Sequence, residues 1–295
     1  MKICHYGSNQ AGAVVGDKVY PIGEAMVKAG HLKPGYTMVD VVDRLANNTA
    51  AMHCAQDCTK SGSSVPLGSV KLLAPIPNPP SFWAAASNYR AHQAEMLDKM
   101  GSVDRAKFSK DDLMAEFFLK PSSAIIGPGD TVVLPKFSID VDFECELCAV
   151  IGKRAKQVTE DKALDIVFGY TICWDLSQRE PWGKGRNNTR IIRKAWDTFT
   201  ALGPWIVTKD EIPDPQDLMI NVEQNGKHEM SAHTGDMICG LRDHIRFLTM
   251  GITLRPGDLI TTGTPAGVRK LRDGDHLRGS IEKIGEMELQ VRDER

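Results

Sequence analysis

The stretch Val141-Asp142-Phe143-Glu144-Cys145-Glu146-Leu147-Cys148-Ala149-Val150-Ile151-Gly152 decides how this chain folds. Its pattern predicts a strand over 142–151, whose side chains alternate between two faces. Glu144 and Glu146 then point the same way, roughly 7 Å apart along the backbone. The opposite face is apolar and suited to a protein core; it carries Val141, Phe143, Cys145, Leu147 and Ala149.

Two neighbouring carboxylates on an apolar strand repel each other, so we expect a positive group between them. A hard divalent cation is the simplest candidate, because it prefers oxygen ligands. A third acid, Asp175, ends another apolar run that begins at Gly169. The sequence therefore predicts a Mg²⁺ or Mn²⁺ site made from Glu144, Glu146 and Asp175. The alternative is a solvated strand face on which the two glutamates meet water.

The overall charge is nearly balanced. The 295 residues include 36 basic and 38 acidic side chains, for a net charge of −2. This balance gives no electrostatic reason to expect a nucleic acid or membrane partner. The N-terminal residues lack the apolar stretch of a signal peptide, and the seven dispersed cysteines form no framework pattern. We therefore expect a cytoplasmic protein with free thiols.

A proline-rich segment divides the chain. Four prolines fall within residues 73–80, which can be neither helix nor central strand, so we expect a stiff linker there. Residues 1–72 are predicted to form a small α+β domain, and residues 81–295 the larger, catalytic one.

The larger part is β-rich. Candidate strands are 82–86, 122–126, 131–133, 142–151, 167–174, 202–208, 218–225, 258–262 and 287–292. Helical patterns cover 23–30, 39–56, 89–100, 111–117, 161–166 and 240–250. Many strands with few helices between them favour a mixed, β-rich α/β fold built as a β-roll or barrel, over a doubly wound sheet.

Polar groups in other segments are further candidates. On a helix over 89–100, His92 and Glu95 share a face, and a carboxylate beside an imidazole suits general-base catalysis. Lys194 lies among aromatic residues, where it could anchor a carboxylate or stabilise an enolate. Lys120 follows an apolar run, and Thr264 lies in the glycine-rich segment 261–268, whose backbone could approach a ligand closely. Each of these features also has a non-functional explanation. His92 and Glu95 could be a surface pair, the lysines could be solvated, and the segment 261–268 could be a structural turn.

Taken in order, these segments resemble the fumarylacetoacetate hydrolase family. The resemblance spans roughly residues 82–290, and its blocks are Ser87 to His92 with Glu95, Phe118 to Pro121, Asp142 to Leu147, Gly169 to Arg179, Lys194 to Pro204, Asn225-Gly226, Thr234 to Ile238 and Leu254 to Val268.

The resemblance implies a β-roll catalytic domain with a small N-terminal domain, usually assembled as a homodimer. It implies Mg²⁺ or Mn²⁺ on Glu144, Glu146 and Asp175. It places His92 and Glu95 on a lid, where they would activate water. Substrate contacts are implied for Lys120, Arg179, Lys194 and Thr264, with Lys194 and Thr264 stabilising negative charge.

The function implied is metal-dependent hydrolysis of a C–C bond in a 1,3-diketo acid of the acylpyruvate type, giving a 2-keto acid and a carboxylic acid. The family also contains hydratases and isomerases of 2-oxo-dienoates and decarboxylases of oxaloacetate, which use the same cation and an enolate. A non-catalytic protein that keeps the cation for stability is the remaining alternative.

Two segments depart from the family pattern. The stretch after Asp175 carries extra positive charge at Lys184, Arg186, Arg190 and Arg193. The segment between Met96 and Phe117 is longer than in small acylpyruvate hydrolases. The longer segment favours a substrate other than the smallest acylpyruvates, one that is larger or doubly anionic.

Overall fold

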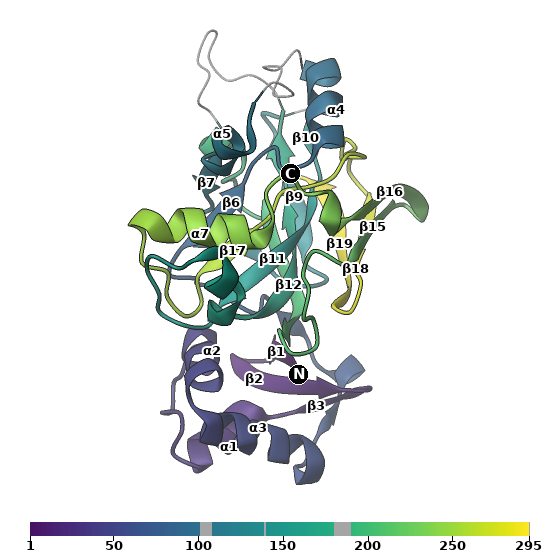
Figure 1. The fold of residues 1–295 in the computed structure, drawn as a ribbon. Coiled ribbons are helices and arrows are strands. Elements are labelled where there is room, and N and C mark those ends of the chain that lie inside the picture. Colours follow the sequence, from purple (N-terminus) through teal and green to yellow (C-terminus); the bar gives the residue numbers. More distant parts are fainter. Residues whose placement is uncertain (101–107, 139, 180–189, 295) are drawn as a thin grey trace.

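The computed structural model describes residues 1–100, 108–138, 140–179 and 190–294. Its backbone is organised around a large sheet whose central path runs β4-β3-β2-β1-β14-β12-β11-β17-β6-β7, with β5 paired to β1 and β8 to β14. A second sheet has the order β16-β15-β18-β19-β9, and β10 pairs with β13. Figure 1 shows α1, α2 and α3 at one end of the molecule and α4 at the other.

The strands of the large sheet are β1 Lys2–Tyr6, β2 Gln10–Val15, β3 Lys18–Tyr20, β4 Val65–Pro66, β5 Leu72–Leu73, β6 Phe82–Ala85, β7 Phe117–Leu119, β8 Ile125–Ile126, β11 Cys145–Ile151, β12 Val167–Asp175, β14 Thr200–Thr208 and β17 Leu259–Thr261. The remaining strands are β9 Thr131–Leu134, β10 Val141–Asp142, β13 Ser177–Gln178, β15 Met219–Gln224, β16 Lys227–His233, β18 His276–Ile281 and β19 Gly285–Asp293. The helices are α1 Ile22–Lys28, α2 Met38–Asn47, α3 Thr49–Ser61, α4 Arg90–Met100, α5 Lys110–Met114, α6 Arg190–Arg193 and α7 Leu241–Gly251. The fold is mixed α/β and sheet-rich, as the sequence predicted.

Strand β11 is buried on both faces. Leu147, Ala149 and Ile151 belong to the main core, which also holds Val141, Phe143 and Cys145. Cys148 and Val150 face a second core, shared with the N-terminal helices. The expected apolar face is therefore confirmed, and the other face is apolar as well beyond Glu146. Such a strand belongs at the centre of a sheet, and β11 lies between β12 and β17.

The first strand connects the N-terminal residues to the large sheet. β1 pairs antiparallel with β14, through Lys2 opposite Val207 and Ile3 opposite Ile206. Its other partners, β2 and β5, belong to the N-terminal part of the chain. One sheet therefore runs through both parts on either side of the proline-rich segment.

Four predicted elements differ from those observed. The helix expected over 39–56 is two helices, because the Asn48 side chain accepts a hydrogen bond from the Ala51 N–H (3.0 Å) and starts α3 as an N-cap. The strand expected over 142–151 is interrupted at Phe143 and Glu144. The segment 122–126 is mostly a 3₁₀ turn, and helix α5 ends at Met114, so that Phe117 begins β7.

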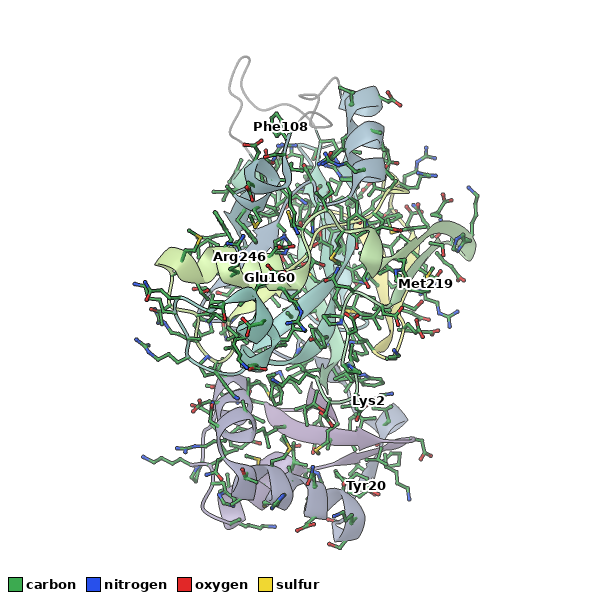
Figure 2. All side chains as sticks on the ribbon, in the orientation of Figure 1. Lys2, Tyr20, Phe108, Glu160, Met219 and Arg246 are labelled. Carbon is green, nitrogen blue, oxygen red and sulfur yellow. The ribbon has the colours of Figure 1, made fainter. Side chains whose placement is uncertain are left out.

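Side chains fill the space between the two sheets and the surrounding helices (Figure 2). Helix α7 contributes Leu241, Ile245 and Leu248 to the main core. Within the described residues, no helix combines the length and apolar character needed to cross a bilayer.

Helix α7 also buries an imidazole. His244 is 2% exposed, its ring lies edge-on to Phe117, and its Nδ1 has no hydrogen-bond partner among the described residues. Burial lowers the pKa of His244 from 6.5 to about 4, with Asp243 opposing and Lys110 adding to the shift. The folded protein thus binds fewer protons than the unfolded chain between these pH values.

Stability is therefore expected to fall as the pH drops from 6.5 to 4, with His244 contributing up to about 3 kcal/mol of the loss. In His244→Phe, which keeps an aromatic ring, urea unfolding at several pH values should show a smaller loss over this range. His53→Gln on the exposed side of α3 is the control and should keep the wild-type dependence. Equal pH dependence in His244→Phe and wild type would contradict the prediction.

Candidate active site

The register of β11 and β12 brings three acids to one face. Cys145 lies opposite Trp174 and Glu146 opposite Cys173. The same register extends to Glu144, the residue before β11, because the Asp175 N–H donates to the Glu144 carbonyl (2.8 Å). Each of the three carboxylates offers an oxygen within 4.8 Å of the others, and all three residues are buried. The predicted cluster of Glu144, Glu146 and Asp175 is thus assembled, although Glu144 lies just outside the strand.

Glu146 is held from the side of β17 and the loop that follows it. The Thr261 hydroxyl and the Gly263 N–H (2.8 Å) both donate to its Oε2 atom. Gly263 has φ +86°, and a Cβ there would lie 2.9 Å from Asn88 Cβ. Only glycine adopts this conformation without strain while bringing its N–H so close to Glu146.

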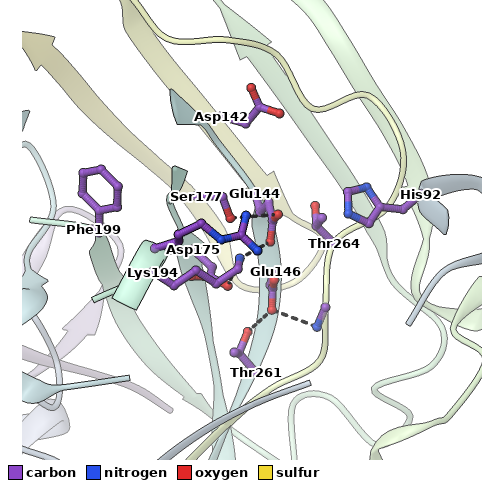
Figure 3. A network of polar contacts seen from close by, with 12 residues as sticks. His92, Asp142, Glu144, Glu146, Asp175, Ser177, Lys194, Phe199, Thr261 and Thr264 are labelled. Atoms are coloured by element: carbon purple, nitrogen blue, oxygen red, sulfur yellow. Dashed lines mark hydrogen bonds and ion pairs between the residues drawn. The ribbon is translucent and has the colours of Figure 1, made fainter. Parts of the chain in front are cut away.

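Two lysines contact the other two carboxylates, and Figure 3 shows one of them, Lys194, beside Glu144 and Asp175. Lys194 Nζ lies 2.7 Å from Glu144 Oε2 and 2.5 Å from Asp175 Oδ2. Lys120 Nζ donates to Asp175 Oδ1 and to the carbonyls of Lys194 (2.9 Å) and Phe199 (3.3 Å). The Lys120 side chain is fully buried, so its ammonium contacts Asp175 from within the protein.

An arginine and a serine complete the contacts of Glu144. Arg179 donates through Nη2 to Glu144 Oε1 (2.7 Å) and through Nε to Asp142 Oδ2 (3.1 Å). Ser177 donates to the same Glu144 oxygen (3.1 Å). The predicted Arg179 is therefore at the site, where it contacts the carboxylate cluster.

The electrostatics of the cluster are uneven. Burial opposes ionisation of Glu144, but Lys194 and Arg179 outweigh it and lower the pKa of this carboxyl. Burial, with the charges of Asp175 and Glu144, raises the pKa of Glu146 to about 8. Burial opposes the charge of Lys194 as well, yet Asp175 and Glu144 raise its pKa. Three buried carboxylates with one of them short of positive charge form a donor set that suits a hard divalent cation.

His92 and Glu95 lie on α4, as the sequence predicted. His92 Nδ1 is 3.5 Å from Glu95 Oε2, and this nitrogen has no hydrogen-bond partner among the described residues. Figure 3 shows His92 and Lys194 on opposite sides of the carboxylates, with Thr264 on the His92 side. The Thr264 hydroxyl is 3.5 Å from the Cys145 carbonyl and is buried.

Sequence reasoning missed several groups that hold these side chains. Asp142 and Ser177 come from the short pair β10 and β13, and Thr261 and Gly263 come from the chain around the end of β17. Asp142 lies within the acidic stretch 141–152, and Gly263 lies within the glycine-rich segment 261–268. Neither pattern indicates which side chain the residue would contact. The cationic residues Arg190 and Arg193 lie on α6, where Arg190 pairs with Glu116 (3.2 Å). Lys184 and Arg186, also expected to add charge, lie outside the described residues.

Comparison with known proteins agrees with this geometry. The family model "Fumarylacetoacetate (FAA) hydrolase C-terminal" matches residues 81–292, beginning where the proline-rich segment ends. Maleylpyruvate hydrolase of Aquipseudomonas alcaligenes is 35% identical over 296 residues, covering 99% of each chain. The mitochondrial oxaloacetate tautomerase FAHD2A of Bos taurus is 37% identical over 229 residues, which are 75% of this chain and 69% of that protein.

A solved structure shares the whole fold. Maleylpyruvate hydrolase from Sphingobium sp. SYK-6, crystallised in complex with manganese(II) and pyruvate, superposes with a TM-score of 0.81 and 31% identity, and each chain is covered completely. With the family match across most of its length, the chain belongs to the fumarylacetoacetate hydrolase family.

Proposed function

We propose that this enzyme is a divalent-metal-dependent hydrolase that cleaves a C–C bond in an acylpyruvate-type 1,3-diketo acid. The products are a 2-keto acid and a carboxylic acid. The single observation that carries the proposal is the buried trio of Glu144, Glu146 and Asp175, with Lys194 on one side and the His92–Glu95 pair on the other. The similarity to maleylpyruvate hydrolases over the full chain supports it.

Glu144, Glu146 and Asp175 would hold one Mg²⁺ or Mn²⁺. When bound, such a cation supplies Lewis-acid polarisation to the keto acid oxygens and neutralises developing negative charge. Lys120 contacts Asp175 and Arg179 contacts Glu144, so these two cations orient two of the three carboxylates that would bind the metal. Direct contact of these two side chains with substrate stays a prediction.

The remaining steps would belong to side chains on both sides of the carboxylates. His92, oriented by Glu95, would take a proton from water, whose oxygen attacks the carbonyl of the acyl group. Lys194 and Thr264 would donate hydrogen bonds to the oxygen that gains negative charge. The C–C bond then breaks, the acyl group leaves as a carboxylic acid, and His92 returns the proton to the carbon of the pyruvate enolate.

We further propose that the acyl group carries a second carboxylate, as in maleylpyruvate. The basic residues of α6 support this, because Arg193 donates to the Gln178 carbonyl (3.1 Å) immediately before Arg179. Burial, Arg179 and Arg190 lower the pKa of Arg193, which places it among like charges. Arg179 and Arg190 are themselves paired with acids, and we assign recognition of the second carboxylate to Arg193, because a guanidinium binds a carboxylate but not a neutral acyl chain.

Keto–enol tautomerisation of oxaloacetate is the second candidate, favoured by the similarity to FAHD2A. It needs the same cation and a proton transfer at carbon, but no attack by water. Isomerisation or hydration of a 2-oxo-dienoate and decarboxylation of oxaloacetate use the same enolate chemistry.

We also propose that the protein is a cytoplasmic homodimer whose partners are small keto acids. Its seven free cysteines agree with a reducing compartment. Light scattering after gel filtration tests the dimer.

The test of function is turnover of an acylpyruvate panel that includes maleylpyruvate, together with oxaloacetate, each assayed with Mg²⁺, Mn²⁺ or EDTA. Metal-dependent release of pyruvate and a carboxylic acid is the expected result. Loss of the oxaloacetate enol without pyruvate release would favour the tautomerase. Pyruvate from oxaloacetate alone would favour decarboxylation, and no turnover on the panel would rule out the proposed hydrolase.

A further inference from the structure

Residues 267–271, in the loop between β17 and β18, are fixed beside the carboxylate cluster. The Phe143 N–H donates to the Arg269 carbonyl (3.4 Å), and the Leu271 N–H donates to the Val141 carbonyl (2.7 Å). Between these bonds, Lys270 forms a bridge to Asp142. The backbone of Arg269 is therefore tied to the residue that precedes Glu144.

The side chain of Arg269 extends from this segment to Glu95 on helix α4. Its Nη1 atom lies 3.5 Å from Glu95 Oε1, and its Nε atom lies 2.8 Å from Glu229 Oε2. The Gly267 N–H donates to the other oxygen of Glu95, Oε2 (3.1 Å). Both oxygens of the lid carboxylate thus face the same segment.

Gly267 is needed for this approach. It has φ +113°, and a Cβ there would lie 2.6 Å from the Glu229 carbonyl oxygen. The backbone of β16 therefore sets the position of the Gly267 N–H, while the Glu229 side chain sets the position of Arg269.

The contact between Glu95 and His92 differs in kind from the contacts with Arg269 and Gly267, which are hydrogen bonds. His92 Nδ1 is 3.5 Å from the oxygen that already accepts the Gly267 N–H, without hydrogen-bond geometry. The orientation of Glu95 is thus fixed by Gly267 and Arg269, and the imidazole must align with a carboxylate that is already in place.

We propose that Arg269 is a positioning residue, which holds Glu95 between α4 and the segment that carries Gly267 and Arg269, and thereby aligns His92 as the base. The proposal rests on the proposed function for its catalytic consequence, since it assigns a role within the same site. Arg269 has 45% of its side chain exposed and Glu95 has 16%, so the contact is open to solvent at its outer edge. Its contribution is therefore expected to be that of orientation, on the scale of about tenfold.

The chain offers a matched control. Lys227 contacts the same Glu229, with Nζ 2.7 Å from Oε1, and no contact with Glu95 is recorded for it among the described residues. Lys227→Gln removes one cation from Glu229 and leaves Arg269 in place. Arg269→Gln removes the cation that reaches Glu95, and Arg269→Lys keeps the charge.

The experiment is steady-state kinetics of the metal-loaded full-length variants with the best acylpyruvate. Arg269→Gln is expected to lower kcat about tenfold with KM within about twofold of wild type. Arg269→Lys should recover part of kcat, and Lys227→Gln should behave as wild type. An unchanged kcat in Arg269→Gln, an equal fall in Lys227→Gln, or a rise in KM alone would overturn the proposal.

A second measurement does not depend on catalysis. In NMR spectra of protein with ¹⁵N-labelled histidine, the His92 ring signal is identified by its loss in His92→Asn. At fixed pH this signal should move in Arg269→Gln and stay in place in Lys227→Gln. An unmoved signal overturns the positioning role even if the enzyme is active. A moved signal with no turnover by wild type would instead count against the proposed reaction.

Discussion

Glu146→Gln is expected to lower metal-dependent turnover by about 1,000-fold or more, which corresponds to about 4 kcal/mol of transition-state stabilisation. The amide has the shape of the carboxylate, and its oxygen can still accept from Thr261 and Gly263, as Oε2 does. Its NH₂ group then points toward Glu144 and Asp175, where it can donate but cannot bind a cation. The variant should thus keep the fold and lose a ligand.

Thermal unfolding separates these two effects. Because burial, Asp175 and Glu144 raise the pKa of Glu146 to about 8, this carboxyl is largely neutral at pH 7 in the metal-free protein, and the amide of glutamine resembles it. Metal-free Glu146→Gln should melt no lower than wild type. The stabilisation by added Mg²⁺ or Mn²⁺, about 2.7 kcal/mol at 100 times the Kd, should largely disappear. Glu160→Gln, an exposed acid, is the control.

Two outcomes would contradict this prediction. Wild-type kcat with unchanged metal dependence would show that Glu146 is not a ligand. A lower melting temperature of the metal-free variant, with the metal-induced increase intact, would assign Glu146 a structural role.

His92→Asn is expected to lower turnover about 100- to 10,000-fold, the usual contribution of a positioned general base. Asparagine keeps a polar side chain on the buried face of α4 but cannot take a proton from water near neutral pH. Since His92 lies on the opposite side of the carboxylates from Lys194, metal affinity should stay near wild type. Initial rates, together with the metal-induced change in melting temperature, provide the measurement.

His53→Asn on α3 is the control for loss of a histidine. Near-normal hydrolysis by His92→Asn would show that another group activates water. A parallel loss of metal affinity would instead indicate that the imidazole supports the cation site.

The carboxylate cluster could be predicted because the information for it is local. Alternation placed Glu144 and Glu146 together, and an apolar run ending on Asp175 marked the neighbouring strand. Their relation depended on the register of β11 and β12, which pairs Glu146 with Cys173. Two buried antiparallel strands allow few registers that bury every apolar residue, so the predicted proximity of Asp175 to Glu144 and Glu146 was well constrained.

The residues that contact these carboxylates could not be predicted, because each contact joins segments that are distant in the sequence. Lys120 reaches Asp175 across 55 positions, and the Gly263 N–H reaches Glu146 across 117. A lysine after an apolar run can face solvent, substrate or an acid, and only the packed fold distinguishes these. The contact of Arg269 with Glu95, separated by 174 positions, has no sequence signal at all.

The pairing of β1 with β14 has a consequence for how the chain acquires its structure during synthesis. Lys2 and Ile3 leave the ribosome about two hundred residues before their partners Val207 and Ile206. The pairs of β1 with β2 and with β5 can form early, whereas the edge of β1 at Lys2 and Ile3 stays open while most of the chain is made. Contacts of such long range slow folding and leave a strand edge available to other chains. Strand β1 is therefore made long before its pairing with β14 is complete, and nascent chains are most prone to association during that interval.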